Sequence, residues 1–133
     1  MSKQGKIWGT TEALLKNPIV EWHRIEVNKG FKCSVHKHSY KHNAFYVEKG
    51  ALQILIYRDN VGAAAAITGV GNSISETIDR TLLTDGDHTT IAPNVYHCFV
   101  ALEDTIAFEL YWPELLTEDI RRLNSGGPVD GAE

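Results

Sequence analysis

Short stretches rich in β-branched and aromatic residues, separated by turn signals, recur along most of this chain. The first clear stretch, 19–27 (IVEWHRIEV), ends at a turn signal of asparagine, lysine and glycine. The other stretches predicted to be strands are 31–38, 44–48, 52–58, 77–83, 89–92, 96–102 and 105–112. About eight short strands at this close spacing predict an all-β sandwich or barrel. No shift in composition divides them, so we expect one domain over 1–124.

Helical patterns are confined to the two ends of the chain. The segment 10–15 is one short candidate helix. The segment 117–123 is the other, with Thr117 as a plausible N-cap and with Ile120 and Leu123 three positions apart. Residues 125–133 (SGGPVDGAE) are small, polar and rich in glycine and proline. Such a stretch buries too little apolar surface to order itself, so we expect a disordered tail.

The segment 60–75 (NVGAAAAITGVGNSIS) is long for a connection between two strands. Connections longer than ~12 residues are usually either functional or disordered. One interpretation is a mobile surface loop, and the other is a lengthened hairpin that covers the mouth of a pocket. We predict that it lies near a pocket mouth.

Composition and charge narrow the classes of function. With 133 residues and 43% hydrophobic residues, the chain can bury one ordinary core. The formal net charge of −4 and the absence of a basic stripe argue against nucleic acid as a partner. The amino-terminal residues have no apolar stretch of signal-peptide length, and the longest small-residue run, 62–67, is too short to span a bilayer. Two cysteines, Cys33 and Cys98, do not make a disulfide scaffold, so a cytoplasmic protein with reduced thiols is expected.

Histidines concentrate in one segment and recur after a later turn. His36 and His38 are two positions apart on a predicted strand, so their rings should face the same side. His97 opens another predicted strand directly after the turn signal Pro93-Asn94. Three imidazoles leave positions on a metal ion free for water or substrate, which is typical of a catalytic site rather than a structural one. The pattern therefore predicts a divalent metal ion bound by His36, His38 and His97.

The two histidine segments resemble the two sequence motifs of the cupin superfamily. In the first segment Gly30 is followed by FKCSV, His36-Lys37-His38, SYKH, Asn43, AFYVEK and Gly50. Every spacing agrees with the family motif, and Asn43 stands where the family carries a glutamate ligand.

In the second segment Gly86 is followed by DHTTI, Ala92-Pro93-Asn94, VY and His97. Here the spacing to the histidine agrees, with alanine and asparagine in the usual proline and glycine places. The resemblance implies a cupin double-stranded β-helix, a small jelly-roll barrel, with short terminal helices.

A narrower resemblance covers about residues 5–124. The stretches GKIWG, LLTDGDHTTIAPNVYH and FELYWPELLTEDIRRLN are similar to the cupin domain of type II mannose-6-phosphate isomerases. This resemblance implies an aldose–ketose isomerase of sugar phosphates that uses a divalent metal. His36 stands where those proteins often carry glutamine, and the segment 60–75 is additional. No nucleotidyl-transferase domain is present in the sequence, so guanylyl transfer is not expected.

Asn43 is expected to complete the metal site as the group next to the three histidines. The family spacing points to position 43, and strand alternation then places Phe45 and Val47 on the inner face with it. A turn between His38 and Asn43 would break that alternation, so His42 remains an alternative ligand. Three neutral histidines and an amide leave the ion its full +2 charge, which makes it a stronger Lewis acid. Zinc, iron, manganese, nickel and copper all stay open.

The reaction and its residues are less defined by the sequence. Residues that can act as a general base are His42, Glu48, Glu109 and His88, and residues that can hold a phosphate are Lys32, Lys37, Lys41, Arg58 and Arg80. A three-histidine iron dioxygenase and a non-catalytic sugar-binding barrel are the alternative functions.

Regular strand alternation places both cysteines away from the site. We also expect a homodimer, formed through an exposed strand edge at 19–27 and through Phe31, Cys33 and Val35.

Overall fold

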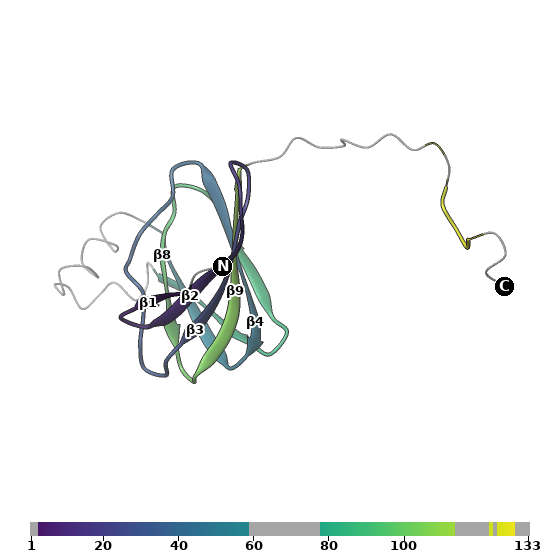
Figure 1. The fold of residues 1–133 in the computed structure, drawn as a ribbon. Coiled ribbons are helices and arrows are strands. Elements are labelled where there is room, and N and C mark those ends of the chain that lie inside the picture. Colours follow the sequence, from purple (N-terminus) through teal and green to yellow (C-terminus); the bar gives the residue numbers. More distant parts are fainter. Residues whose placement is uncertain (1–2, 59–77, 114–122, 124, 130–133) are drawn as a thin grey trace.

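The computed structural model describes residues 3–58, 78–113, 123 and 125–129 (Figure 1). Within these ranges the chain forms strands and no helix. In order the strands are β1 (Lys3–Lys6), β2 (Gly9–Lys16), β3 (Glu21–Val27), β4 (Lys41–Lys49), β5 (Ala51–Tyr57), β6 (Ile78–Thr84), β7 (His88–Ile91), β8 (Tyr96–Ala101) and β9 (Thr105–Pro113). The prediction of an all-β fold is confirmed.

The strands form two antiparallel sheets that curve around one interior (Figure 1). The first sheet has the order β1-β2-β3-β9-β4-β7, and the second has the order β6-β5-β8. Neighbours β3 and β9, and β9 and β4, are far apart in sequence, so the central part of the large sheet is built from non-local pairings. The turn predicted at Asp85-Gly86 connects β6 to β7, and Gly86 has a φ of 87°, a value that glycine adopts without strain.

The core lies between the inner faces of the two sheets. On β4 the side chains of Asn43, Phe45 and Val47 are buried, which is the alternation predicted for this strand. Phe45 meets Phe99 of β8 across the interior, with ring centroids 5.8 Å apart. Trp8 packs edge-on against the same Phe99 at 5.0 Å. Aromatic pairs of this geometry stabilise a core beyond the area they bury, and here they join the small sheet to the large one.

The helix predicted at 10–15 is wrong, because these residues belong to β2. The residues Glu12, Ala13 and Leu14 favour helices intrinsically, yet β2 is hydrogen-bonded to β1 on one side and β3 on the other. Pairing across the sheet satisfies the backbone and overrides a weak local preference. The shift of register between Ala13 and Leu15 also blurs the alternation that would have marked a strand.

The segment predicted as a strand at 31–38 follows β8 without being a regular strand. It makes two isolated bridges, between Lys32 and Val100 and between His36 and His97. Four residue steps separate the bridged residues on this segment, against three on β8. One extra residue is therefore accommodated here, as in a β-bulge, and it reverses which side chains face inward.

Some predictions need correction or fall outside the described ranges. The segment 19–27 is not an exposed edge, because β3 lies between β2 and β9. The segment 60–75 and the helix predicted at 117–123 lie outside the described residues, apart from Leu123. Residues 125–129 form no strand or helix. No helix in the described part of the chain is long and apolar enough to cross a membrane.

Candidate metal centre and its cavity

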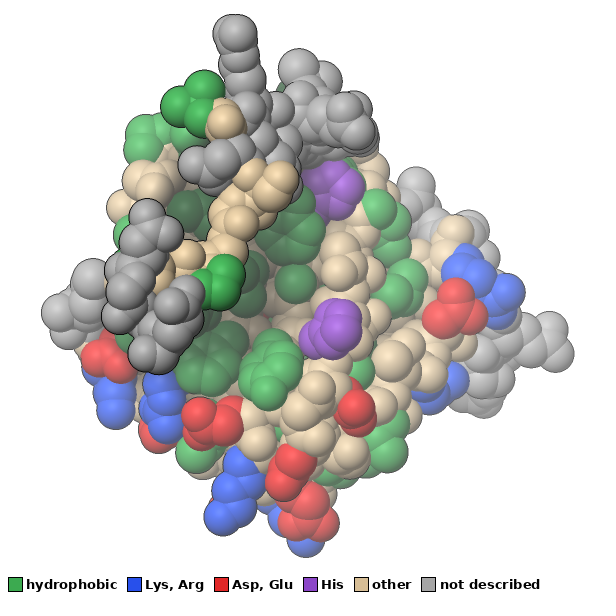
Figure 2. Space-filling view, turned by 90° about the vertical axis from the view of Figure 1, so that its right-hand side faces the viewer, with side chains coloured by type: hydrophobic (Ala, Val, Ile, Leu, Met, Phe, Trp, Pro, Cys, Tyr) green, Lys and Arg blue, Asp and Glu red, His purple; other side chains and the backbone are tan. Residues whose placement is uncertain are grey.

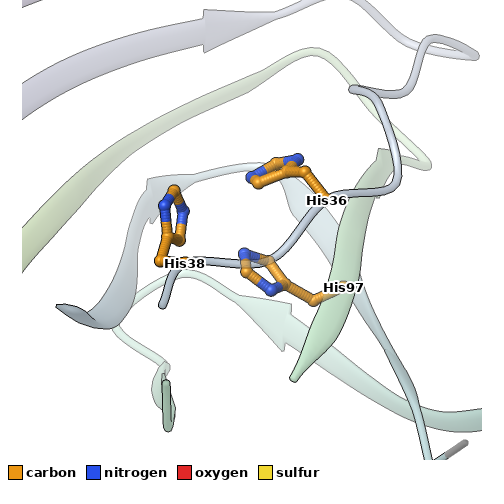
Figure 3. A group of neighbouring side chains, drawn as sticks. All are labelled: His36, His38 and His97. Atoms are coloured by element: carbon orange, nitrogen blue, oxygen red, sulfur yellow. The ribbon is translucent and has the colours of Figure 1, made fainter. Parts of the chain in front are cut away.

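Three histidine side chains meet at one end of the barrel. His36 and His38 come from the segment before β4, and His97 comes from β8 (Figure 3). Two backbone hydrogen bonds, of 3.0 Å and 2.8 Å, pair the backbone of His36 with that of His97. The backbone N–H of Asn94, in the turn before β8, donates to the carbonyl of His38 at 2.7 Å. The ligand nitrogens of the three rings all lie within 4.8 Å of one another.

Backbone carbonyls determine which ring nitrogen of two histidines is free. The Nδ1 atom of His36 lies 2.8 Å from the carbonyl of Ser34, and Nδ1 of His97 lies 2.8 Å from the carbonyl of Val95. Since a carbonyl only accepts, Nδ1 carries the proton in both rings and donates it. The lone pair then lies on Nε2, and a hydrogen bond of this kind is what orients a metal-binding histidine.

Burial favours the neutral form of two of the rings, those of His38 and His97. Burial lowers the pKa of His97 to about 4, with His36 and His38 as further contributors. Burial also lowers the pKa of His38, helped by the nearby charges of His36 and Lys41. The Nε2 atoms of His38 and His97 are buried and have no hydrogen-bond partner in the described structure. Neutral rings with unpaired nitrogens are the form that binds a metal ion.

The donor set fits a divalent metal ion. Histidine nitrogens lie about 2.0–2.1 Å from a zinc ion, so two of them in tetrahedral coordination are roughly 3.4 Å apart. The three nitrogens lie within 4.8 Å of one another, so the rings need to approach by at most roughly 1.4 Å, which side-chain rotations supply.

Asn43, rather than His42, faces the interior. Asn43 is 1% exposed, and its Nδ2 donates to the carbonyl of Leu110 at 3.1 Å. Its Oδ1 is buried without a hydrogen-bond partner. His42 lies on the opposite face of β4 and stacks on Trp112, with ring centroids 5.6 Å apart and planes 12° apart. The alternative in which His42 binds the metal is therefore not supported.

A cavity of about 530 Å³ opens beside the histidines. Its lining combines polar groups from β1, β2, β3, β4 and β9 with apolar side chains from the core. The lining residues are Gln4, Lys6, Ile7, Trp8, Thr11, Glu21, His23, Cys33, Ser34, His36, His38, Lys41, Phe99, Glu109 and Tyr111. A volume of this size suits a small molecule such as a monosaccharide.

One carboxyl group is buried in the cavity wall. Glu109 is 8% exposed, and burial raises its pKa to about 7, although Tyr111 and Asn43 act in the opposite direction. The hydroxyl of Tyr111 donates to Glu109, and the ring of Tyr111 packs edge-on against His38 at 5.0 Å. Tyr111 therefore connects the carboxyl group to the histidine cluster.

Some of the residues considered for catalysis and phosphate binding line the cavity, and the others do not. Of the four candidate bases, Glu109 lines the cavity, whereas His42, Glu48 and His88 do not. Of the five candidate phosphate ligands, Lys41 lines it and the others do not. Lys37 instead lies over the ring of Tyr96 at 4.9 Å, and Arg58 pairs with Asp79 at 3.4 Å.

The prediction that Cys33 faces away from the site is wrong. Cys33 lines the cavity, and its sulfur accepts the backbone N–H of Phe99 at 3.2 Å. The extra residue between Lys32 and His36 explains the reversal. Burial raises the pKa of the Cys33 thiol to about 12, so it stays protonated. Cys98 is buried beside the hydroxyl of Tyr57, 3.7 Å from its sulfur, and both cysteines are free thiols.

Several cavity residues were not identified by sequence reasoning. Glu21 and His23 lie on β3 and face inward together with Ile25, so strand alternation from the buried Ile25 was the available signal. Lys6 lines the cavity from β1, a strand of four polar or small residues with no periodic pattern. No feature of the sequence marked it.

Comparison with known proteins supports the fold but no particular activity. No protein-family model matches the sequence, and no curated protein matches it. KdgF from Halomonas sp. is similar in structure, with a TM-score of 0.63, 18% identity, and coverage of 86% of this chain and 90% of that one. An RmlC-like cupin from Shewanella frigidimarina NCIMB 400 has a TM-score of 0.59 and 22% identity, covering 83% of this chain and 82% of that one.

A third similar structure is the Cnp3 cupin domain of Schizosaccharomyces pombe, with a TM-score of 0.62 and 10% identity. The match covers 86% of this chain and 69% of that one. Identities at this level establish the fold alone, and the narrower likeness to mannose-6-phosphate isomerases stays a prediction. The two-sheet topology and these likenesses together establish that this chain has the cupin fold, and that it carries a three-histidine group able to hold a metal ion.

Proposed function

We propose that this chain is a metal-dependent cupin enzyme, with the aldose–ketose isomerisation of a sugar phosphate as its reaction. The observation that carries the proposal is the pair of buried, unpaired Nε2 atoms on His38 and His97, beside His36 and a cavity of about 530 Å³. An unsatisfied buried polar atom costs about 1–3 kcal/mol, so two of them in one cluster favour a ligand that pairs with both. A divalent metal ion is that ligand.

Asn43 supplies the fourth protein group of the proposed site. Its Oδ1 is a third buried atom without a partner, and its Nδ2 is already occupied by the carbonyl of Leu110. The amide is thus held with its oxygen free. A neutral oxygen donor in place of a carboxylate leaves the bound ion with its full +2 charge.

Glu109 is the general base of the proposed reaction. When bound, the metal polarises an oxygen of the substrate, which acidifies the carbon-bound proton next to the carbonyl. Glu109 removes that proton and returns it to the neighbouring carbon, while the hydroxyl proton of the sugar moves to the former carbonyl oxygen. Tyr111 holds the carboxyl group by donating its hydroxyl proton to it. The support for this role is position, since Glu109 alone among the four candidate bases lines the cavity.

An iron-dependent dioxygenase is the second candidate function. The histidine cluster contains no carboxylate among its three members, and three-histidine iron sites support dioxygen chemistry. A barrel that binds a sugar without reaction is the third.

Metal analysis of the purified protein, followed by two activity assays, tests these functions. We expect about one zinc or manganese ion per chain and conversion of mannose 6-phosphate to fructose 6-phosphate. Glu109→Gln should abolish the conversion at unchanged metal content, whereas Glu48→Gln, on the outer side of β4, should leave it intact. Bound iron with oxygen uptake would favour the dioxygenase. A bound sugar without turnover would favour the binding barrel, and a chain that takes up no metal would refute the proposal.

A further inference from the structure

We propose that Lys6 and Lys41 form an anion-binding subsite in the cavity, which selects ligands that carry a carboxylate or phosphate group. The inference rests on the proposed function, because it concerns the same cavity as the three histidines. Lys6 comes from β1 and Lys41 begins β4, so two separate elements bring a cation to one space.

Lys6 and Lys41 line the same cavity as His23 and Glu109. Burial lowers the pKa of His23 in the cavity wall; Lys16, Lys41 and Lys6 act in the same direction, and Glu21 acts in the opposite one. Three cations therefore act on one position of the wall, where an anion would be stabilised.

The carboxylate of Glu21 offsets part of this charge. Glu21 forms ion pairs with Lys41 at 3.3 Å and with Lys16 at 3.5 Å, so one carboxylate is shared between two cations. Lys6 makes no ion pair within the described residues. A metal ion bound without a carboxylate ligand would add further positive charge at the histidine end of the same cavity.

A small molecule can contact both ends of the cavity. The Nζ atom of Lys41 lies 5.7 Å from the ring centroid of Tyr111, and that ring is 5.0 Å from the ring of His38. One aromatic side chain thus separates the lysine from the metal-binding histidine. The side chains of Gln4 and Thr11 line the same cavity and offer neutral donors. A molecule with an oxygen-rich body and one acidic group matches this arrangement.

Lys41 and Lys16 provide a matched pair for the test. Both pair with Glu21, but only Lys41 lines the cavity. Binding of glucose, glucuronate and glucose 6-phosphate is measured by calorimetry with the zinc-loaded protein and with the protein stripped by chelator. We expect both charged sugars to bind at least about tenfold more tightly than glucose, because charge-assisted contacts are the stronger ones. We expect Lys41→Met and Lys6→Met to reduce that preference and Lys16→Met to preserve it.

Measurements on the metal-free protein distinguish anion binding by the lysines from anion binding by the metal ion. A preference for charged sugars that survives removal of zinc supports the subsite, whereas a preference that vanishes with zinc assigns it to the metal and overturns the inference. Equal binding of all three sugars, no binding of any, or equal effects of Lys41→Met and Lys16→Met would also overturn it. Zinc content is measured on the same samples. It shows whether the chain binds metal even when the lysines do not bind an anion. The relative affinities of glucuronate and glucose 6-phosphate then distinguish a carboxylate ligand from a phosphate ligand.

Discussion

At one end of the sheet formed by β3, β9 and β4, the inner and outer faces carry reversed chemistry. Toward the interior the strands present polar side chains there, which are His23, Glu109, Tyr111 and Asn43, whereas Ile25, Phe45, Val47 and Ala107 make the rest of the inner face apolar. Toward the exterior they present aromatic ones, which are Trp22, Phe108, Trp112 and Tyr46. A sheet with one solvated face ordinarily shows the opposite pattern, with apolar residues inside and polar residues outside.

The reversal separates two roles of one sheet. Polar groups in an interior raise the free energy of the fold, so a cluster of them beside a cavity is typical of a binding or catalytic site. Aromatic groups on an outer face contribute little to a monomer but much to an interface with another surface. Figure 2 shows hydrophobic side chains gathered in the middle of the face turned to the viewer. Of the outward-facing aromatic residues of this sheet, Trp22 is 40% exposed and Tyr46 is 43% exposed.

The largest effect should come from removing a histidine of the interior, compared with removing one from the outer face of β4. We expect His97→Ala to weaken zinc binding by roughly a hundredfold or more, because even indirect changes around a metal ligand cost about 10–100-fold. His42→Ala removes the same side chain from the outer face and should leave zinc affinity unchanged. Zinc titration with a competing chelator measures both, with thermal melting to verify that the variants are folded. Equal affinities in the two variants would refute the division between the faces.

Glu109, on the inner face, should make the stability of the fold depend on pH. Its pKa is raised from 4.5 to about 7 on folding, so the folded state holds the proton more tightly than the unfolded state. The free energy of unfolding of the metal-free protein should then fall as the pH rises from about 4.5 to above 7, by at most roughly 3 kcal/mol. Glu109→Gln should remove this loss, while Glu48→Gln should keep it.

Urea unfolding at pH 5 and pH 8 checks the prediction. The lowered pKa of His97 acts in the opposite sense, because it destabilises the fold as the pH falls from 6.5 toward 4. The difference between wild type and Glu109→Gln cancels that contribution, since both proteins contain His97. A difference that does not change with pH would contradict the prediction.

A smaller change is expected from restoring an acidic group at position 43. Asn43→Glu adds a negative oxygen ligand to a doubly charged ion, so we expect zinc affinity to rise by about tenfold. Without metal the same substitution buries a second carboxyl group near Glu109 and should lower the melting temperature. Zinc should therefore raise the melting temperature more in the variant than in the wild type. Unchanged affinity would show that Asn43 does not reach the ion.

The last effect concerns the outer face. We predict a two-fold dimer that buries the aromatic residues around Trp22 and Phe108, whose rings are 6.1 Å apart. Trp22→Ser should weaken association by about tenfold, as expected for a central aromatic residue of an interface. Leu82→Ser, which removes a 53% exposed hydrophobic residue from β6, should not. Light scattering at micromolar concentration measures the mass, and a monomeric wild type would contradict the prediction.

Much of the barrel could be predicted from local sequence, because most of its strands are bounded by turn residues such as Asp85-Gly86. The segments 10–15 and 31–38 could not, for one physical reason. Both deviate from regular alternation by a register shift or an extra residue, and such a shift depends on the partner strand rather than on the segment itself. Period-two reasoning therefore placed Phe45 and Val47 correctly and Cys33 incorrectly.

The site could be predicted as far as a motif determines it. The spacings of the two motifs predict His36, His38 and His97 as one cluster, and the structure brings the three rings together. The polar wall of the cavity could not be predicted in this way. Glu109, His23 and Lys6 reach it through pairings between distant strands, and only the folded sheet brings them together.

The extra residue between Lys32 and His36 also determines where the protein can tolerate the deletion of one residue. Removing one residue there would give the segment the same number of steps as β8, so Cys33 and the first histidine would both still face inward. Removing one residue between His36 and His38 would turn the second ring away from the first. We therefore expect natural or laboratory deletions to be tolerated on one side of His36 and to abolish metal binding on the other, which the zinc content of the two deletion variants would show.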